Sequence, residues 1–180
     1  MIGATPIAIV IIAAIAENRV IGSANAMPWQ MKSDLRHFRS VTLNKPVIMG
    51  RKTLQAIGRA LPQRTNVIVT RDPDFGAADV IAAPDLASAL RVGRADALRR
   101  GVDEIIVAGG GNLYAQALPL ADRLIITQIH AKLEGDVFFP EIDLKLWREH
   151  SREARRSAPG DDYDSDIVTY IRSGGCDNAA

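Results

Sequence analysis

Cysteine is almost missing from this sequence, with one residue, Cys176, among 180. A single cysteine excludes an internal disulfide framework and suits a reducing compartment, so we expect a cytoplasmic protein. An excess of charge of either sign is also missing, because 22 Lys and Arg stand against 21 Asp and Glu, a net charge of +1. This balance does not favour nucleic acid or an anionic membrane as a partner.

The chain also lacks an apolar run long enough to cross a bilayer. Ile7 to Ile12, followed by Ala14-Ile15-Ala16, imitates the core and cleavage site of a signal peptide, but no Lys or Arg precedes it. A membrane-spanning helix needs about twenty apolar residues. A β-branched run of this length instead predicts a central strand that is buried on both faces.

Metal and nucleophile signatures are missing as well. His37, His130 and His150 have no ligand spacing among themselves, and the single cysteine adds none. The aspartates between positions 161 and 166 lack the glycine and the closing glutamate of an EF-hand loop. No Ser or Cys nucleophile motif occurs. We therefore expect no metal site and no covalent catalysis.

What the chain does contain is an alternation of apolar runs and helical patterns. This alternation predicts an α/β fold: a single domain, residues 1–172, with a mostly parallel, twisted sheet of about eight strands flanked by helices. The tail, residues 173–180, is expected to fray. The expected strands are Ile7–Ala16, Pro46–Gly50, Thr65–Thr70, Val80–Ala83, Glu104–Ala108 and Arg123–Ile129. The expected helices are Lys32–Val41, Arg51–Ile57, Leu86–Arg100 with Gly93 as a candidate interruption, and Asn112–Leu118.

The last third of the chain differs in pattern. Trp147–Ala154 and Ile167–Arg172 are expected strands, and the polar segment between them, Ser157–Ser165, is rich in Asp, Gly and Pro. Two such runs joined by turn residues predict an antiparallel hairpin at the C-terminal end of the sheet.

Asp34 is the most informative side chain. It lies just inside the expected helix that follows the loop Gly22–Trp29, and its sequence neighbours include Met27, Trp29 and Phe38. A lone carboxyl among apolar side chains is costly to keep ionised, so its pKa should rise and it can exchange protons near neutral pH. Ser33, or a neighbour, is expected to cap the helix that carries it.

Three segments at expected strand ends suit a phosphorylated ligand. Gly109–Gly111 lies between a strand and a helix, where backbone N–H groups can approach a phosphate, although its spacing is not that of the Rossmann fingerprint. Gly50–Thr53 brings two cations and a hydroxyl to a second junction, and Thr70–Arg71 brings a cation to a third. Each segment taken alone is also explained by solvated charges or turn residues at the end of a strand. Together they favour ligand binding at the C-terminal ends of the strands.

Arg64 is a further candidate, between Leu61-Pro62 and the next strand. Its planar guanidinium can hold a carboxylate through two hydrogen bonds. Sequence position alone favours a surface arginine in a turn.

Taken together, these segments resemble the bacterial dihydrofolate reductases over nearly the whole chain. Their order and spacing are specific in combination, while no single stretch is decisive. The matching stretches begin with Ala13-Ala14, Val20-Ile21-Gly22, Asn25-Ala26-Met27-Pro28-Trp29, Asp34-Leu35 with Phe38, and Leu43-Asn44-Lys45-Pro46-Val47-Ile48-Met49-Gly50-Arg51-Lys52-Thr53. They continue with Ile57-Gly58-Arg59, Leu61-Pro62, Gly109-Gly110-Gly111 with Tyr114, Thr127, Glu134-Gly135-Asp136 and Phe139-Pro140. The chain departs from the pattern in a few extra N-terminal residues and a longer Leu86–Arg100 region.

The resemblance implies NADPH-dependent reduction of 7,8-dihydrofolate to tetrahydrofolate, with hydride added at C6 and a proton at N5, in support of one-carbon and thymidylate metabolism. It also implies a monomer that binds antifolate inhibitors. Asp34 would be the acid of the site and Thr127 would orient it. Met27 and Trp29 would belong to a lid, the loop Ala24–Trp29, that closes over the nicotinamide. A cis peptide would join Gly109 and Gly110.

The resemblance further implies two sets of contacts. The substrate would touch Ile12, Ala13, Asp34, Leu35, Phe38, Ile57, Arg59, Leu61, Arg64 and Thr127, with Arg64 on its glutamate α-carboxylate. The cofactor would touch Ala14, Ile21, Gly22, Asn25, Ala26, Arg51, Lys52, Thr53, Thr70, Arg71, Gly109, Gly110, Gly111, Asn112, Leu113 and Tyr114.

Two other functions share parts of this pattern. A riboflavin-pathway pyrimidine reductase of the same fold would keep the glycine-rich half but would not need Asp34 opposite Arg64. A nucleotide-binding protein without catalysis would bind NADPH and turn over no pterin. Asp34 and Thr127 together argue against both.

Overall fold

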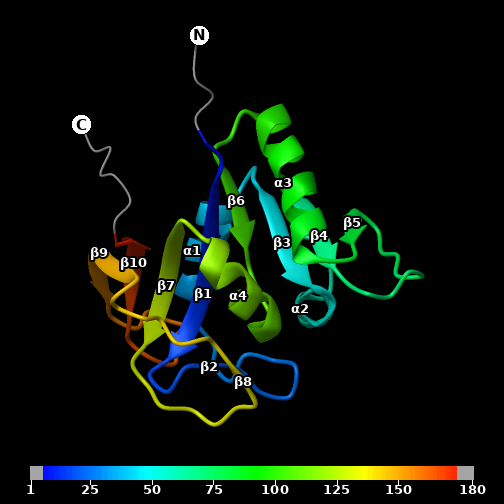
Figure 1. Cartoon of the computed structure of the whole chain (residues 1–180). Helices are drawn as coiled ribbons and strands as arrows, with labels where there is room; N and C mark the ends of the chain where they lie inside the picture. The colour runs from blue at the N-terminus through cyan, green and yellow to red at the C-terminus, as the bar shows by residue number, and fades with distance from the viewer. Residues whose placement is uncertain (1–5, 174–180) are drawn as a thin grey trace.

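An eight-stranded sheet runs through the molecule in the order β5-β4-β3-β6-β1-β7-β10-β9, as seen in a computed structural model that describes residues 6–173 (Figure 1). The strands of this sheet are β1 (Ala8–Ala16), β3 (Pro46–Gly50), β4 (Thr65–Val69), β5 (Val80–Ala83), β6 (Glu104–Val107), β7 (Arg123–Ile129), β9 (Trp147–Arg155) and β10 (Ser165–Arg172). The helices are α1 (Lys32–Thr42), α2 (Arg51–Ile57), α3 (Leu86–Arg100) and α4 (Gly111–Ala117), with a 3₁₀ turn, η1 (Leu118–Leu120), after α4.

The strand directions confirm the predicted sheet. β1 pairs in parallel with β6 on one side and with β7 on the other, and β3, β4 and β5 continue the parallel part. β10 runs antiparallel to both β7 and β9, so the sheet ends in the predicted hairpin. Val10 and Ile11 of β1 are fully buried, as expected for a central strand covered on both faces.

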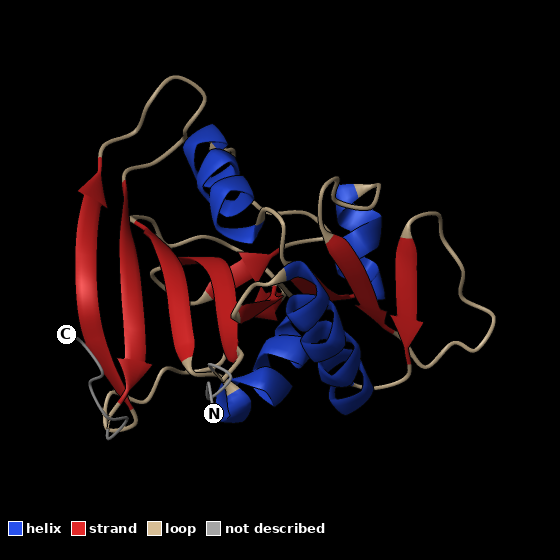
Figure 2. Ribbon diagram, turned by 90° about the horizontal axis from the view of Figure 1, so that it is seen from above, coloured by secondary structure: helices blue, strands red, loops and turns tan. Residues whose placement is uncertain are grey.

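Side chains of β1 alternate between the two faces of the sheet, and each face is covered by its own helices (Figure 2). Ile9, Ile11 and Ala13 pack in one core cluster with residues of α3 and α4. Val10 and Ile12 pack in a second cluster with Leu54 of α2, against which residues of α1 also lie. This alternation follows from the two-residue period of a strand and yields three layers, helix–sheet–helix.

A second, two-stranded sheet was not predicted. β2 (Val20–Gly22) pairs antiparallel with β8 (Val137–Phe138). Strands this short carry too little alternation to be recognised in a sequence. Gly135, just before β8, permits this close approach, because a Cβ there would lie 2.4 Å from Val20 Cγ1 and 2.5 Å from the Gly22 carbonyl oxygen.

Helix α3 is continuous through Gly93, so the predicted interruption is wrong. A Cβ at position 93 would lie 3.1 Å from Ile105 Cγ2, which shows that the glycine allows α3 to pack closely on β6 rather than ending the helix. The predicted start is confirmed, since the Asp85 carboxylate accepts a 2.7 Å hydrogen bond from the Ser88 amide.

The start of α1 differs from the prediction. No side chain at its own N-cap accepts a hydrogen bond there. Instead, Asp161 in the loop between β9 and β10 accepts a 2.9 Å bond from the Ser33 amide, and Asp162 accepts a 2.7 Å bond from the Gln30 amide. The first turn of α1 is therefore fastened by a loop that is distant in sequence. Of the tail predicted to fray, residues 173–180, Ser173 is described and its amide donates a 2.9 Å hydrogen bond to the Leu146 carbonyl. Residues 174–180 lie outside the described residues.

Across residues 6–173, no helix is both long and apolar enough to cross a membrane.

Candidate active site

Asp34 and Thr127 form the centre of one half of the site. Thr127 lies on β7 in register with Ala14 of β1, and its hydroxyl donates a 2.5 Å hydrogen bond to Asp34 Oδ1. Burial raises the pKa of the Asp34 carboxyl above its ordinary value, although the Thr127 hydrogen bond and the nearby His37 and Arg155 oppose part of the rise. The structure thus brings these two side chains together, as predicted, and gives the carboxyl an elevated pKa.

Trp29 and Met27, the two side chains expected in the lid, lie in different surroundings. Trp29 is buried in a cluster with Ala16, Val20 and Met31, and its indole N–H has no hydrogen-bond partner in the described part of the chain. Met27 is about half exposed, at 49%. A buried donor without a partner is available to a water molecule or a ligand.

Before Trp29, the lid makes a tight turn. Ser23 and Ala26 exchange two backbone hydrogen bonds, and the residues between them, Ala24 and Asn25, both have positive φ angles of 48° and 63°. This is the geometry of a type I′ turn, which asparagine tolerates well and alanine poorly.

Arg64 is buried, with 9% of its surface exposed, so the alternative of a surface arginine is wrong. Its guanidinium donates to Thr42 Oγ1 at 3.1 Å and to the carbonyl oxygens of Pro62 at 2.7 Å and Arg39 at 3.1 Å. These bonds use Nε and one N–H on each terminal nitrogen. Since a guanidinium has five N–H donors, one remains on each terminal nitrogen, and these two are available to a carboxylate.

The apolar side chains predicted to line the substrate site lie at different depths. Ile12 and Ala13 are buried in β1, and the Ile12 carbonyl accepts a 2.7 Å bond from the Tyr114 hydroxyl. Phe38 and Leu61 are half-buried against the cluster between the sheet and α2. Leu35 and Ile57 are 53% and 40% exposed, unusually open for large apolar residues, and Arg59 is also exposed.

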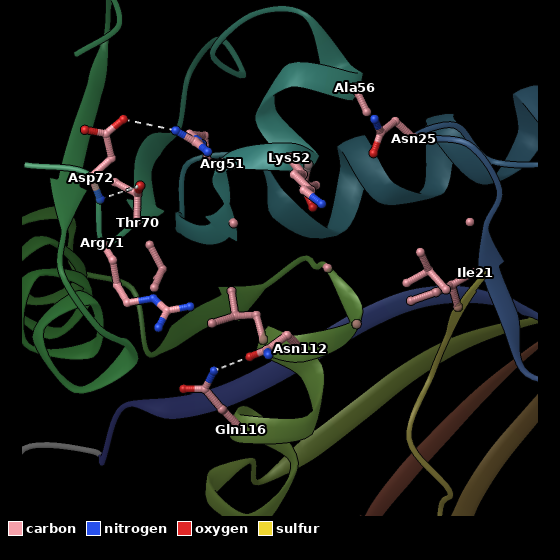
Figure 3. Close-up of a pocket in the computed structure, with 18 of the residues that line it drawn as sticks. Ile21, Asn25, Arg51, Lys52, Ala56, Thr70, Arg71, Asp72, Asn112 and Gln116 are labelled. Carbon is pink, nitrogen blue, oxygen red and sulfur yellow. Dashed lines mark hydrogen bonds and ion pairs between the residues drawn. The ribbon is translucent and has the colours of Figure 1, made fainter. Parts of the chain in front are cut away.

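The second half of the site is a cavity of about 970 Å³ beside α2 and α4 (Figure 3). It brings together residues predicted for the cofactor from four separate segments of the chain. These are Ile21, Gly22, Asn25 and Ala26 from β2 and the lid, Arg51, Lys52 and Thr53 from α2, Thr70 and Arg71 after β4, and Gly110, Gly111, Asn112 and Leu113 at the start of α4. The cavity does not reach three predicted residues: Ala14 is half-buried, and Gly109 and Tyr114 are buried.

Other residues line the cavity without having been predicted there. They are Ala56, Val69, Asp72, Pro84, Asp85, Gln116 and Val137, whereas Met27 and Gly50 also line it and belong to the predicted lid and to the predicted phosphate segment. Val137 depends on the short strand β8, which left no signal in the sequence. Asp72 and Asp85 follow β4 and β5, and the rule that ligands bind beyond the C-terminal ends of parallel strands would have found them.

The cavity suits a phosphorylated dinucleotide. Both α2 and α4 begin after a glycine, and neither has a side-chain cap, so the first amides of each helix are free to meet a ligand oxygen. A Cβ at Gly111 would lie 2.9 Å from Val137 Cγ1, so only glycine fits that approach. The peptide between Gly109 and Gly110 is cis, as predicted. Three cations, Arg51, Lys52 and Arg71, stand on the wall.

Within residues 6–173, no group of three or more His, Cys, Asp or Glu side chains is placed to hold a metal ion. Cys176 lies outside the described residues.

A partly buried carboxyl beside a cavity that suits a phosphorylated dinucleotide, in a sheet of this topology, fits one class of protein, the nicotinamide-dependent reductases. The comparisons identify the family. The model of the family described as dihydrofolate reductase matches residues 8–172. The chain is 46% identical to a type 3 dihydrofolate reductase from Salmonella typhimurium, over 90% of this chain and 96% of that one. It is 44% identical to a dihydrofolate reductase from Neisseria meningitidis, over 91% and 98% of the two chains.

A solved structure agrees with these relatives. Dihydrofolate reductase from Enterococcus faecalis, complexed with NADP(H) and RAB-propyl, is 30% identical, with a TM-score of 0.81 over 92% of this chain and 96% of that one. This chain belongs to the dihydrofolate reductase family, which confirms the fold, the enzyme class and the NADPH-dependent reaction that the sequence predicted.

Proposed function

We propose that this chain reduces 7,8-dihydrofolate to tetrahydrofolate with Asp34 as the single acid of the site. The observation that carries the proposal is the partly buried Asp34 carboxyl, which accepts a 2.5 Å hydrogen bond from Thr127 and whose pKa is raised. In such surroundings, the field of a carboxylate is poorly screened, so it stabilises positive charge on a neighbouring pterin ring. Asp34 hydrogen-bonds that ring and favours protonation at N5, and the protonated imine is the better hydride acceptor.

NADPH, when bound, supplies the hydride that C6 receives, while Asp34 favours the protonation of N5. Thr127 fixes the direction in which Asp34 presents its second oxygen, since the first accepts the Thr127 hydroxyl. Trp29 offers its free indole N–H to a water or to substrate, and the lid that carries it and Met27 limits the access of bulk water. These roles support a reaction in which the protein orients groups and manages one proton.

The substrate tail ends at Arg64 in this proposal. Its two remaining N–H groups, one on each terminal nitrogen, match the two oxygens of the glutamate α-carboxylate. The three oxygens that already accept from Arg64 hold the guanidinium still, so little side-chain entropy is lost when the carboxylate binds. Phe38 and Leu61, with the exposed Leu35 and Ile57, supply the apolar surface between tail and ring, and Arg59 lies near the outer end.

The cavity beside α2 and α4 would hold NADPH. The first amides of α2 and α4 and the Thr53 hydroxyl would meet the diphosphate, and Arg51, Lys52, Thr70 and Arg71 belong to the wall that would face the further phosphate that separates NADPH from NADH. Antifolates would occupy the substrate half.

We also propose that residues 1–172 form one domain that acts as a monomer in the cytoplasm and has no nucleic-acid partner. The near-neutral net charge of +1 supports the last point, and the single cysteine supports a reducing compartment.

The test is the loss of nicotinamide absorbance on mixing the protein with NADPH and dihydrofolate. Rapid oxidation that is lost in Asp34→Asn, with NADPH binding retained, is the expected result. Oxidation of NADPH by the pyrimidine substrate of the riboflavin pathway, and not by dihydrofolate, would replace the proposal with the related reductase. Tight NADPH binding without turnover of either substrate would indicate a nucleotide-binding protein without catalysis.

A further inference from the structure

A carboxylate stands among the cations of the cofactor cavity. Arg51, the first residue of α2, places Nη1 3.0 Å from Asp72 Oδ2, across the cavity wall (Figure 3). The pair is neither buried nor fully solvated, since 43% of the Arg51 side chain and 41% of the Asp72 side chain are exposed. Arg51 is therefore already engaged with an anion where a ligand phosphate would be expected.

The Asp72 carboxylate is fixed in place by its own loop. Its other oxygen, Oδ1, accepts a 3.1 Å bond from the Asp74 amide, and the Asp72 amide donates to Thr70 Oγ1 at 3.2 Å. These local bonds hold the carboxylate toward Arg51 independently of the ion pair. A ligand phosphate at Arg51 would have to share that guanidinium with the Asp72 carboxylate, which its own loop holds in position.

Arg71, one residue before Asp72, is in the opposite condition. It lies on the same wall and extends into the cavity toward the side of Asn112 and Gln116 (Figure 3). Among the residues that the structure describes, no hydrogen bond or ion pair engages its guanidinium, so it is available to a ligand. Two neighbouring arginines thus differ in one respect: Arg51 has an internal anion and Arg71 does not.

We propose that Asp72 is a specificity-determining residue, an internal competitor that occupies Arg51 in place of the extra phosphate of NADPH and leaves Arg71 as the principal cation for that phosphate. This inference rests on the proposed function, because it takes the phosphate that distinguishes NADPH from NADH to lie at this wall. Asp72 lowers the preference for the phosphorylated dinucleotide and eases its release. The same carboxylate has no effect on NADH, which has no phosphate there.

The size of the effect follows from exposure. Half-exposed ion pairs contribute modestly, so removing the competing charge should change phosphate affinity about two- to fivefold at low salt, and less at high salt. Asp72→Asn keeps the side-chain shape and the oxygen that accepts from the Asp74 amide. Asp74→Asn is the matched control. It also removes one negative charge, two residues after Asp72, but the Asp74 side chain does not line the cavity.

The experiment measures dissociation constants of NADPH, NADH and adenosine 2′-monophosphate by titration at two salt concentrations. Asp72→Asn should tighten NADPH and adenosine 2′-monophosphate and leave NADH unchanged, whereas Asp74→Asn should change all three little. A second comparison is sharper. Arg51→Gln should weaken NADPH more in the Asp72→Asn background than in the wild type, because only there is Arg51 free for the phosphate.

Weaker NADPH binding in Asp72→Asn would overturn the inference and show that Asp72 positions Arg51 for the phosphate. Equal changes for NADPH and NADH, or equal costs of Arg51→Gln in the two backgrounds, would overturn it as well. Failure of the wild type to bind either dinucleotide would instead refute the proposed function, so the two failures are distinguishable. Thermal midpoints of all variants should agree, since the residues concerned lie at the surface.

Discussion

The two halves of the site manage charge in opposite ways. The substrate half has one partly buried carboxyl, Asp34, and desolvation is the main cause that raises the pKa of that group. The cofactor half has five charged side chains on one open wall, and one of its arginines pairs with an aspartate. A carboxyl that is partly removed from water acts strongly on its neighbours, and no second carboxyl is proposed to replace it. Several solvent-exposed charges are each screened by water and salt, so each contributes weakly to binding.

The difference also separates chemistry from binding. In the proposed function, Asp34 acts on the reacting ring, whereas Arg51, Lys52 and Arg71 face the far end of the cofactor. Substitutions in the two halves should therefore change different kinetic quantities and should differ in size by orders of magnitude.

The largest effect is expected from Asp34→Asn. Loss of the ionisable group should lower turnover at neutral pH by about a hundred- to ten-thousandfold, the usual contribution of acid–base catalysis, with the NADPH dissociation constant unchanged. Single-turnover oxidation of NADPH measures it. Turnover close to that of the wild type would remove Asp34 from the mechanism and erase the contrast between the two halves.

The same variant should be more stable than the wild type at neutral pH. In the unfolded chain the pKa of Asp34 is close to its ordinary value of 3.8, and burial raises it in the folded protein. At a pH between the unfolded pKa and the folded pKa, the unfolded chain has lost its proton whereas the folded protein has kept it. The folded state then binds more protons, and stability falls as the pH rises through this window. Urea unfolding should show the advantage of Asp34→Asn at neutral pH and its disappearance toward the ordinary carboxyl pKa. An advantage that persists in strong acid would have another cause.

Arg64→Leu should weaken dihydrofolate by about 1.5–3 kcal/mol, the value of a charge-assisted hydrogen bond, which is about ten- to a hundredfold in the dissociation constant. The variant also leaves the Arg39 and Pro62 carbonyls without their donor, so a fall in stability is expected. A pterin that lacks the glutamate tail is the control, because it should bind both forms equally. An unchanged dihydrofolate constant would make Arg64 a purely structural residue.

Thr127→Val should lower turnover less, by about fivefold, corresponding to roughly 1 kcal/mol for one hydrogen bond. The lost Thr127 hydroxyl had opposed the rise in the pKa of Asp34, so the pH profile of kcat/KM should move to higher pH. Thr127→Ser should restore both quantities. A drop in turnover without displacement of the profile would show that Thr127 acts only through packing.

The smallest effect is expected from Lys52→Gln in the cofactor half. One exposed charge among several should weaken NADPH by about two- to fivefold, with turnover at saturating NADPH unchanged. The weakening should fade as salt is added. A loss of turnover comparable with that of Asp34→Asn would show that the two halves do not differ as described.

Much of the fold could be predicted, because the long strands and helices have strong local patterns. The buried run of β1 and the hairpin β9–β10 are examples. The pair β2–β8 could not be predicted, since strands of two and three residues have almost no periodicity. Nor could the continuity of α3 at Gly93, which depends on Ile105 of another element.

The same limit applies to the site. Segments at strand ends indicated most of the cofactor wall because local sequence and topology both pointed there. The burial of Arg64 depends on acceptors from α1, and the cap of α1 comes from Asp161, 128 positions away from Ser33. Contacts of that separation leave no local pattern, and the ion pair between Arg51 and Asp72 is of the same kind.

The fastening of α1 by the loop between β9 and β10 has a consequence for how the enzyme is made. The helix that carries Asp34 is synthesised well before Asp161, which lies 128 positions after Ser33. Ordering across so long a separation is slow, because the closure of the intervening chain must be achieved first. We expect the early part of the chain to gain its sheet before its catalytic geometry, so that a nascent chain without the final hairpin would be folded in part and inactive.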